Sequence, residues 1–115
     1  MRPTRISYDP DGDILYITFG QPVASTGYQL SEQILLRVDP KTETASGLTI
    51  FNYSHHAAAS REIPIFQLEE YPDVKPLLMR ILDSAPINQF LSVVAGPQGI
   101  SATLLSPSLQ QAVAG

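Results

Sequence analysis

The chain has no cysteine and no tryptophan among its 115 residues. Without cysteine it cannot form a disulfide, a thiolate nucleophile, a cysteine-ligated zinc site or an iron–sulfur cluster. Positive charge is also scarce, because 7 lysines and arginines stand against 11 acidic residues and the net charge is −4. Surfaces that bind nucleic acid need clustered lysine and arginine. We therefore expect no nucleic-acid partner.

Long apolar runs are missing as well. No stretch approaches the ~20 apolar residues of a membrane-spanning helix, and Met1–Ile6 lacks the apolar run of a signal peptide. We therefore expect a cytoplasmic protein with no membrane partner. The length and the hydrophobic fraction of 43% are typical of a single soluble domain, residues 1–115, with a buried core.

One motif appears twice in the first half of the chain. A strand end, an Asp-Pro turn and a returning strand follow one another over Tyr8–Phe19 and again over Val38–Phe51. Proline suits the second position of a type I turn, and aspartate suits the first. Each copy predicts a β-hairpin. We expect the second turn, Asp39–Ser46, to be longer than the first.

Alternating apolar residues and short connections predict an antiparallel β-meander of about four strands, with a weaker edge strand within Val23–Gln29. Helical spacing and capping residues then predict one or two helices, with Ser54 and Asp73 as candidate N-caps. The predicted fold class is α+β. Its elements are the strands Arg5–Tyr8, Ile14–Phe19, Gln33–Asp39 and Gly47–Phe51, helices over about 55–62 and 74–84, and a C-terminal hairpin over 90–95 and 100–105.

A spaced set of residues in the first half resembles a known family. The set comprises Tyr8-Asp9-x-x-x-Asp13-x-Leu15-Tyr16-Ile17, the strand end Val38-Asp39, Gly47-Leu48-x-Ile50 and Asn52-x-Ser54. It is similar to domain-of-unknown-function family 2283, small β-rich bacterial proteins, over about residues 5–60. Ile14 stands where leucine is common in that family. The resemblance implies a β-rich first half without an assigned activity, and it leaves residues 61–115 as an extension outside it.

Asp9, Asp11 and Asp13 have the spacing of the first three ligands of a calcium-binding loop. In such a loop the invariant glycine would fall at Ile14 and the bidentate glutamate at Gly20, so the match fails. We interpret this segment as a hairpin turn whose aspartates accept hydrogen bonds from nearby backbone N–H groups. The three aspartates remain minor candidates for metal ligands.

His55 and His56 are the only histidines. Neighbouring side chains on a helix point about 100° apart, so the pair cannot easily share one metal ion. A zinc site would need further ligands, which in this chain must be carboxylates. Histidine is nevertheless the usual acid–base residue near neutral pH. The pair is therefore the first place to look for a metal-binding or hydrolytic site.

The residues favour a non-catalytic interaction module that self-associates as a homo-oligomer. The predicted strands are apolar on both faces, and an exposed apolar sheet face is a liability unless it is covered. Tyrosine is also enriched in binding patches. The resemblance implies one alternative, an antitoxin-like protein with a protein partner, and His55 and His56 supply another, an enzyme. We assign no catalytic residue and no cofactor.

Overall fold

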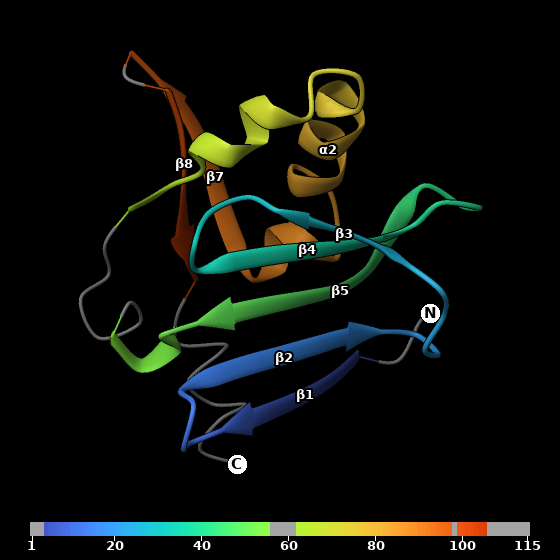
Figure 1. Ribbon diagram of the computed structural model, residues 1–115, viewed down its shortest axis with the longest axis vertical. Coiled ribbons are helices and arrows are strands. Elements are labelled where there is room, and N and C mark those ends of the chain that lie inside the picture. Colours follow the sequence, from blue (N-terminus) through green and yellow to red (C-terminus); the bar gives the residue numbers. More distant parts are fainter. Residues whose placement is uncertain (1–3, 56–61, 98, 106–115) are drawn as a thin grey trace.

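Both Asp-Pro motifs close β-hairpins in the computed structural model, which describes residues 4–55, 62–97 and 99–105. The first half of the chain forms a five-stranded sheet in which every neighbouring pair of strands is antiparallel (Figure 1). Its strands are β1 (Thr4–Asp9), β2 (Ile14–Phe19), β3 (Thr26–Gln29), β4 (Ile34–Asp39) and β5 (Thr44–Phe51).

The order of strands across this sheet is β1-β2-β5-β4-β3. Strands β3, β4 and β5 follow one another as a meander, and the β1–β2 hairpin is then joined to the other side of β5. Strand β5 is the longest of the five and is buried at every position except its two ends. Such a strand gains most from pairing on both sides, because its apolar residues and its backbone groups are then both satisfied.

The two hairpin turns have the same length, so the expectation of a longer second turn is wrong. The last paired residues are Asp9 with Ile14 in the first hairpin and Asp39 with Thr44 in the second. The register of β4 and β5 shifts between Arg37 and Val38. This β-bulge takes up one extra residue, so β5 extends to Thr44 where a loop was expected.

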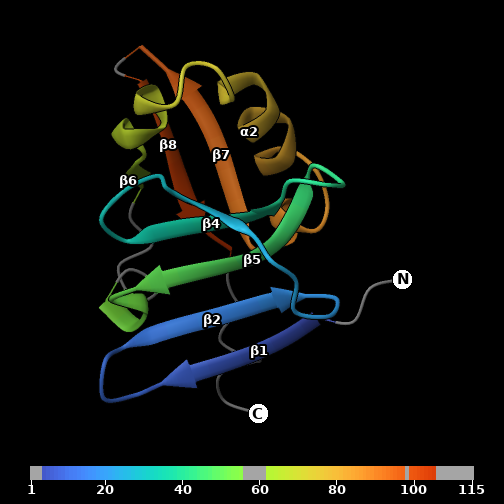
Figure 2. The same ribbon diagram turned by 45° about the vertical axis from the view of Figure 1, so that its right-hand side comes forward.

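The second half of the chain adds a small three-stranded sheet of order β6-β8-β7 and three short helices. Figure 2 shows these elements beside the β3–β5 end of the large sheet, with the β1–β2 hairpin extending beyond them. The elements are β6 (Ile63–Pro64), η1 (Phe66–Glu70), α2 (Lys75–Leu82), η2 (Ile87–Gln89), β7 (Leu91–Gly96) and β8 (Gly99–Leu104). The α+β fold class and the C-terminal hairpin are thereby confirmed.

Both predicted N-caps are wrong. Helix α2 is preceded by Val74, which makes no side-chain capping bond, and Asp73 lies one residue too early. Pro76 falls in the first turn of α2, where its missing N–H costs little. Ser54 is itself helical, since the helical residues after β5 begin at Tyr53. The rest of the helix predicted over 55–62 lies largely outside the described residues.

A single core joins the two halves. One face of the large sheet packs against the helices and the small sheet, and Phe19 on β2 meets Phe90 with ring centroids 5.9 Å apart. The fully buried side chains include Leu15, Leu36, Leu48 and Ile50 from the large sheet and Leu68 and Leu78 from the second half. No helix in the described part of the chain is long and apolar enough to cross a membrane.

The opposite face of the large sheet, called the outer face below, carries no described helix or strand (Figures 1 and 2). Its residues follow from the strand register. One row across the sheet is Ser7, Tyr16, Thr49, Leu35 and Gln29, and the next is Arg5, Thr18, Gly47, Arg37 and Gly27. The outer face is therefore mixed, with exposed tyrosine, two arginines and several hydroxyl groups.

Candidate functional site

The three aspartates of the first turn do not converge on one point. The Asp9 carboxylate accepts a hydrogen bond of 3.1 Å from the backbone N–H of Asp11, and Asp39 does the same for Lys41 at 2.9 Å in the second turn. This local bonding confirms the interpretation of Asp9 as a turn residue. Among the described residues, no three histidine, cysteine or acidic side chains lie close enough together to hold a metal ion.

Asp13 instead joins three separate segments through the Asp13 cluster, which consists of Tyr8, Asp13 and Ser54. The Tyr8 hydroxyl donates to Asp13 Oδ1 at 2.7 Å. Ser54 donates twice, from its backbone N–H to Oδ1 at 3.0 Å and from its Oγ to Oδ2 at 2.8 Å. The cluster therefore ties the end of β1 and the first turn to the helical residues after β5.

Electrostatics stabilises the Asp13 cluster in one protonation state. Burial alone would raise the pKa of Asp13, but the hydrogen bonds from Tyr8 and Ser54 lower it below its ordinary value. The hydrogen bond to Asp13, followed by burial, raises the pKa of Tyr8. The carboxylate thus stays ionised as an acceptor while the phenol stays protonated as a donor. This arrangement is typical of a structural cap rather than of a group that exchanges protons.

The histidine pair is described only in part. His55 is exposed, and its backbone joins the groups that hydrogen-bond to Asp13. His56 lies outside the described residues. The pair as a metal or catalytic site therefore stays a prediction.

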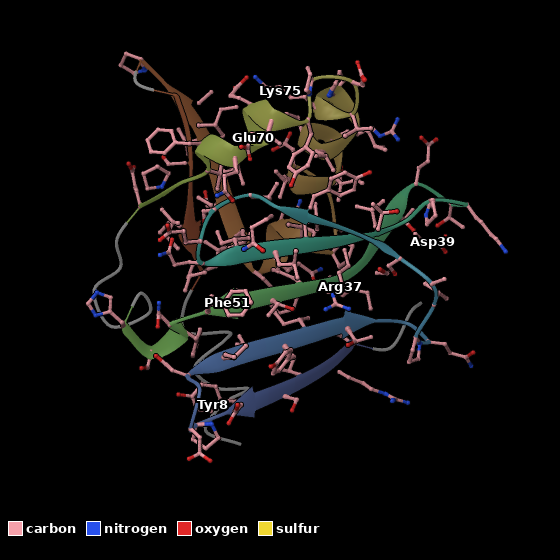
Figure 3. The ribbon with its side chains drawn as sticks, viewed as in Figure 1. Tyr8, Arg37, Asp39, Phe51, Glu70 and Lys75 are labelled. Atoms are coloured by element: carbon pink, nitrogen blue, oxygen red, sulfur yellow. The ribbon has the colours of Figure 1, made fainter. Side chains whose placement is uncertain are left out.

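A second site lies on the outer face at Gly47, in the middle of the sheet. Gly47 stands between Thr18 on β2 and Arg37 on β4. A Cβ atom at this position would lie 3.2 Å from the Ile17 carbonyl oxygen and 3.6 Å from Arg37 Cδ. Gly47 lines a pocket of about 210 Å³, called the Gly47 pocket. Arg37 reaches from β4 toward β5 beside it (Figure 3).

Hydroxyl groups line much of the Gly47 pocket. Thr18 and Thr49 flank Gly47 on the sheet, and Thr49 is only 5% exposed. The hydroxyls of Ser25 and Ser46, which also line the pocket, are 2.6 Å apart, and the β-bulge places Ser46 there. Sequence reasoning missed this pocket. Its signal was a glycine inside a strand, which often marks a bulge or the close approach of another group.

The two edge strands of the large sheet differ in length. Strand β3 at one edge has four residues, whereas β1 at the other has six and pairs only with β2 among the described residues. Arg5, Ser7 and Asp9 of β1 point to the outer face, and Ile6 and Tyr8 are half-buried on the core side. A long edge strand of this kind offers its backbone groups to a further strand.

Comparison with known families adds one finding. Residues 5–54 match the family model of DUF2283, proteins of unknown function. This confirms the resemblance seen in the sequence, and the second half of the chain lies outside the match. No curated protein and no solved structure matches the chain.

The DUF2283 match ends at Ser54 and covers nearly all of β1 and the whole of β2 to β5. It therefore contains the Asp13 cluster, the Gly47 pocket and the β1 edge. Three of the spaced residues that carry the resemblance come together in space, because Tyr8 and Ser54 both donate hydrogen bonds to Asp13.

Proposed function

We propose that this chain is a small cytoplasmic interaction module, without catalysis, that self-associates by pairing its β1 strand with the β1 strand of a second copy. The observation that carries the proposal is the exposed six-residue edge of β1 and its pattern of side chains. The strand contains no proline and no lysine, two of the residues that usually protect an edge from pairing.

The side chains of β1 are complementary to themselves in one register. In an antiparallel pair, residues directly opposite each other point to the same face. A pair centred on Ser7 therefore places Arg5 opposite Asp9 of the second copy on the outer face. The two-fold axis repeats this contact. Opposite charges in such positions each contribute about 0.2–1 kcal/mol.

The same register also pairs apolar groups on the core side. Ile6 then lies opposite Tyr8 of the second copy, and both side chains are only half-buried in the single chain. A register centred on Ile6 would instead oppose Arg5 to Ser7 and lose the charge pairs. Self-association through β1 would continue the sheet across two copies and leave both Gly47 pockets open.

The other two hypotheses are an antitoxin-like protein and an enzyme that uses His55 and His56. Both stay predictions. The backbone of His55 hydrogen-bonds to Asp13, whose carboxylate also accepts hydrogen bonds from Tyr8 and Ser54. This occupancy favours a structural role for the region over a chemical one.

Light scattering over a range of protein concentrations tests the proposal. The wild-type chain should give twice its 12.5 kDa mass at micromolar concentration. Arg5→Asp places an acid opposite Asp9 twice, and we expect it to weaken association by about tenfold or more. Arg80→Asp is the matched control, since it makes the same charge change on α2, away from β1.

A wild-type chain that stays at 12.5 kDa throughout the range would overturn the proposal. So would equal association of wild type and Arg5→Asp. Circular dichroism of each variant separates loss of association from loss of folding. Added salt should weaken the wild-type dimer, because exposed charge pairs are screened.

A further inference from the structure

We propose that the Gly47 pocket binds the oxyanion group of a small ligand, a carboxylate or a phosphate, with Arg37 as its cationic anchor. This inference does not depend on self-association, because β1 is two strands away from Gly47 in the sheet. It rests on an arginine and two threonine hydroxyls that lack partners among the described residues, and on the pocket that they line together with Gly47.

Within the described part of the chain, Arg37 has no side-chain hydrogen bond or ion pair, and the ion pair found there is that of Lys75 with Glu69. The stem of Arg37 is positioned, since its Cβ and Cδ would both lie within 3.7 Å of a Cβ at Gly47. Its guanidinium carries a permanent charge and five N–H donors in a planar fork. Arg37 is exposed, and its unpaired guanidinium beside the pocket is suited to an anion.

The threonine hydroxyls supply the second observation. Thr49 is 5% exposed and lines the pocket. Thr18 also lines the pocket and is paired with Gly47 in the sheet. Neither hydroxyl has a hydrogen-bond partner among residues 4–55, 62–97 and 99–105. Both hydroxyls are therefore free to donate to a ligand in the pocket. The open space of the pocket is where an acceptor for both hydroxyls would lie.

The composition of the pocket selects the charge of the ligand. No acidic side chain of the described residues lines it, so none of them opposes a negative group there. Arginine pairs with carboxylate and phosphate through two parallel hydrogen bonds, and hydroxyls donate to the remaining oxygens. An oxyanion therefore satisfies Arg37, Thr18 and Thr49 together.

The size of the pocket limits the ligand. Its volume of about 210 Å³ lies below the ~300–1,000 Å³ of sites that enclose a whole organic ligand. The pocket therefore takes a head group or a very small acid. Pro22 and Val23 form an apolar part of its rim, and Val23 is 49% exposed. A short apolar body attached to the oxyanion would pack there.

The wall beside Arg37 is built to hold its shape. Ser46 is the residue that the β-bulge inserts into β5, and its hydroxyl is bonded to Ser25 at 2.6 Å. This bond fixes the loop after β2 against β5. Bulges are over-represented next to active sites because they redirect a side chain without breaking the sheet.

Nuclear magnetic resonance titration of the ¹⁵N-labelled chain tests the inference. Sodium phosphate and sodium acetate are added in separate series, with sodium chloride keeping the ionic strength constant. We expect saturable shifts of the Gly47 amide and of the Arg37 Nε–H in at least one series. The series that saturates at the lower concentration identifies the preferred group.

Variants then separate specific binding from a general attraction to positive charge. Arg37→Gln should weaken binding by at least about tenfold, because charge-assisted hydrogen bonds are lost. Arg37→Lys, which keeps the charge without the fork, should fall between Arg37→Gln and wild type. Arg80→Gln is the matched control on α2 and should bind as wild type does.

Gly47→Ala places a methyl group beside Arg37 in the pocket without changing the charge and should weaken binding. If that variant does not fold, Thr49→Val removes one hydroxyl at nearly constant volume and should weaken binding. Absence of a saturable shift in both series would overturn the inference. Equal binding by wild type and Arg37→Gln would overturn it as well. Light scattering on the same samples shows independently whether self-association persists.

Discussion

The two hairpins of the large sheet share one turn and use it differently. In both, an aspartate accepts a hydrogen bond from the backbone N–H two residues later. In both, the last turn residue is left-handed, Asp13 with φ 55° and Glu43 with φ 57°. The Asp13 carboxylate then receives hydrogen bonds from two other segments, whereas the Glu43 side chain has no hydrogen bond or ion pair to any described residue.

The difference comes from the surroundings of each turn. The β4–β5 turn projects from the centre of the sheet, but the β1–β2 turn lies beside the helical residues that follow β5. The N–H groups at the start of those residues need acceptors, and Asp13 supplies one. The same turn conformation therefore serves only as a turn in one place and as a turn and a helix cap in the other.

The largest difference in stability between the two turns should come from truncating the last residue of each turn, Asp13 or Glu43. Asp13→Ala loses the cap and its charge-assisted hydrogen bonds, so we expect a loss of about 1–2 kcal/mol in the free energy of unfolding. Glu43→Ala should change it by no more than about 0.5 kcal/mol. Urea denaturation measures both values. Equal losses would show that the Asp13 cluster does not stabilise the fold.

The second-largest difference between the two turns should appear in the way that stability depends on pH. Because the pKa of Asp13 is lowered in the fold, its contribution is present above the unfolded pKa of about 3.9 and is lost as the pH falls through the folded pKa. Asp13→Asn should remove this part of the acid destabilisation, and Glu43→Gln should not. Melting temperatures between about pH 7 and pH 3 provide the measurement. Parallel curves for wild type and Asp13→Asn would contradict the expectation.

The smallest difference in stability should come from replacing the left-handed residues Asp13 and Glu43 with glycine. Glu43→Gly relieves a conformation that costs about 1–2 kcal/mol but adds the ~0.5–1 kcal/mol of glycine entropy. The net result should be a stabilisation of about 0.5 kcal/mol. Asp13→Gly gains the same relief but loses the cap, so it should destabilise. Stabilisation by both variants would remove the distinction between the turns.

Sequence reasoning succeeded where the signal was local. Alternating apolar residues and Asp-Pro turns placed both hairpins, and helical spacing placed α2. It failed where distant residues meet. The cap of the helical residues after β5 is not Ser54 but Asp13, which lies 41 residues before Ser54 in the chain. No local pattern contains that pairing.

The strand order and the Gly47 pocket were missed for the same reason. Strand β2 lies beside β5 because burial favours a central place for β5, and short connections do not reveal this. The pocket depends on which residues flank Gly47, namely Thr18 and Arg37, and those neighbours follow only from the register. The bulge at Ser46 also shifts the register in a way that alternation cannot predict.

The most direct test of the account is to mix two single variants, Arg5→Asp and Asp9→Arg. Each variant alone opposes like charges across the β1 pair, but a pair formed by one copy of each variant again opposes an acid to an arginine at both contacts. Asp39→Arg, at the equivalent place in the second turn, controls for loss of the turn bond of Asp9. We predict by light scattering that each variant alone stays at 12.5 kDa and that their equimolar mixture gives twice that mass. A mixture that stays at 12.5 kDa while wild type associates would contradict pairing of β1 in this register.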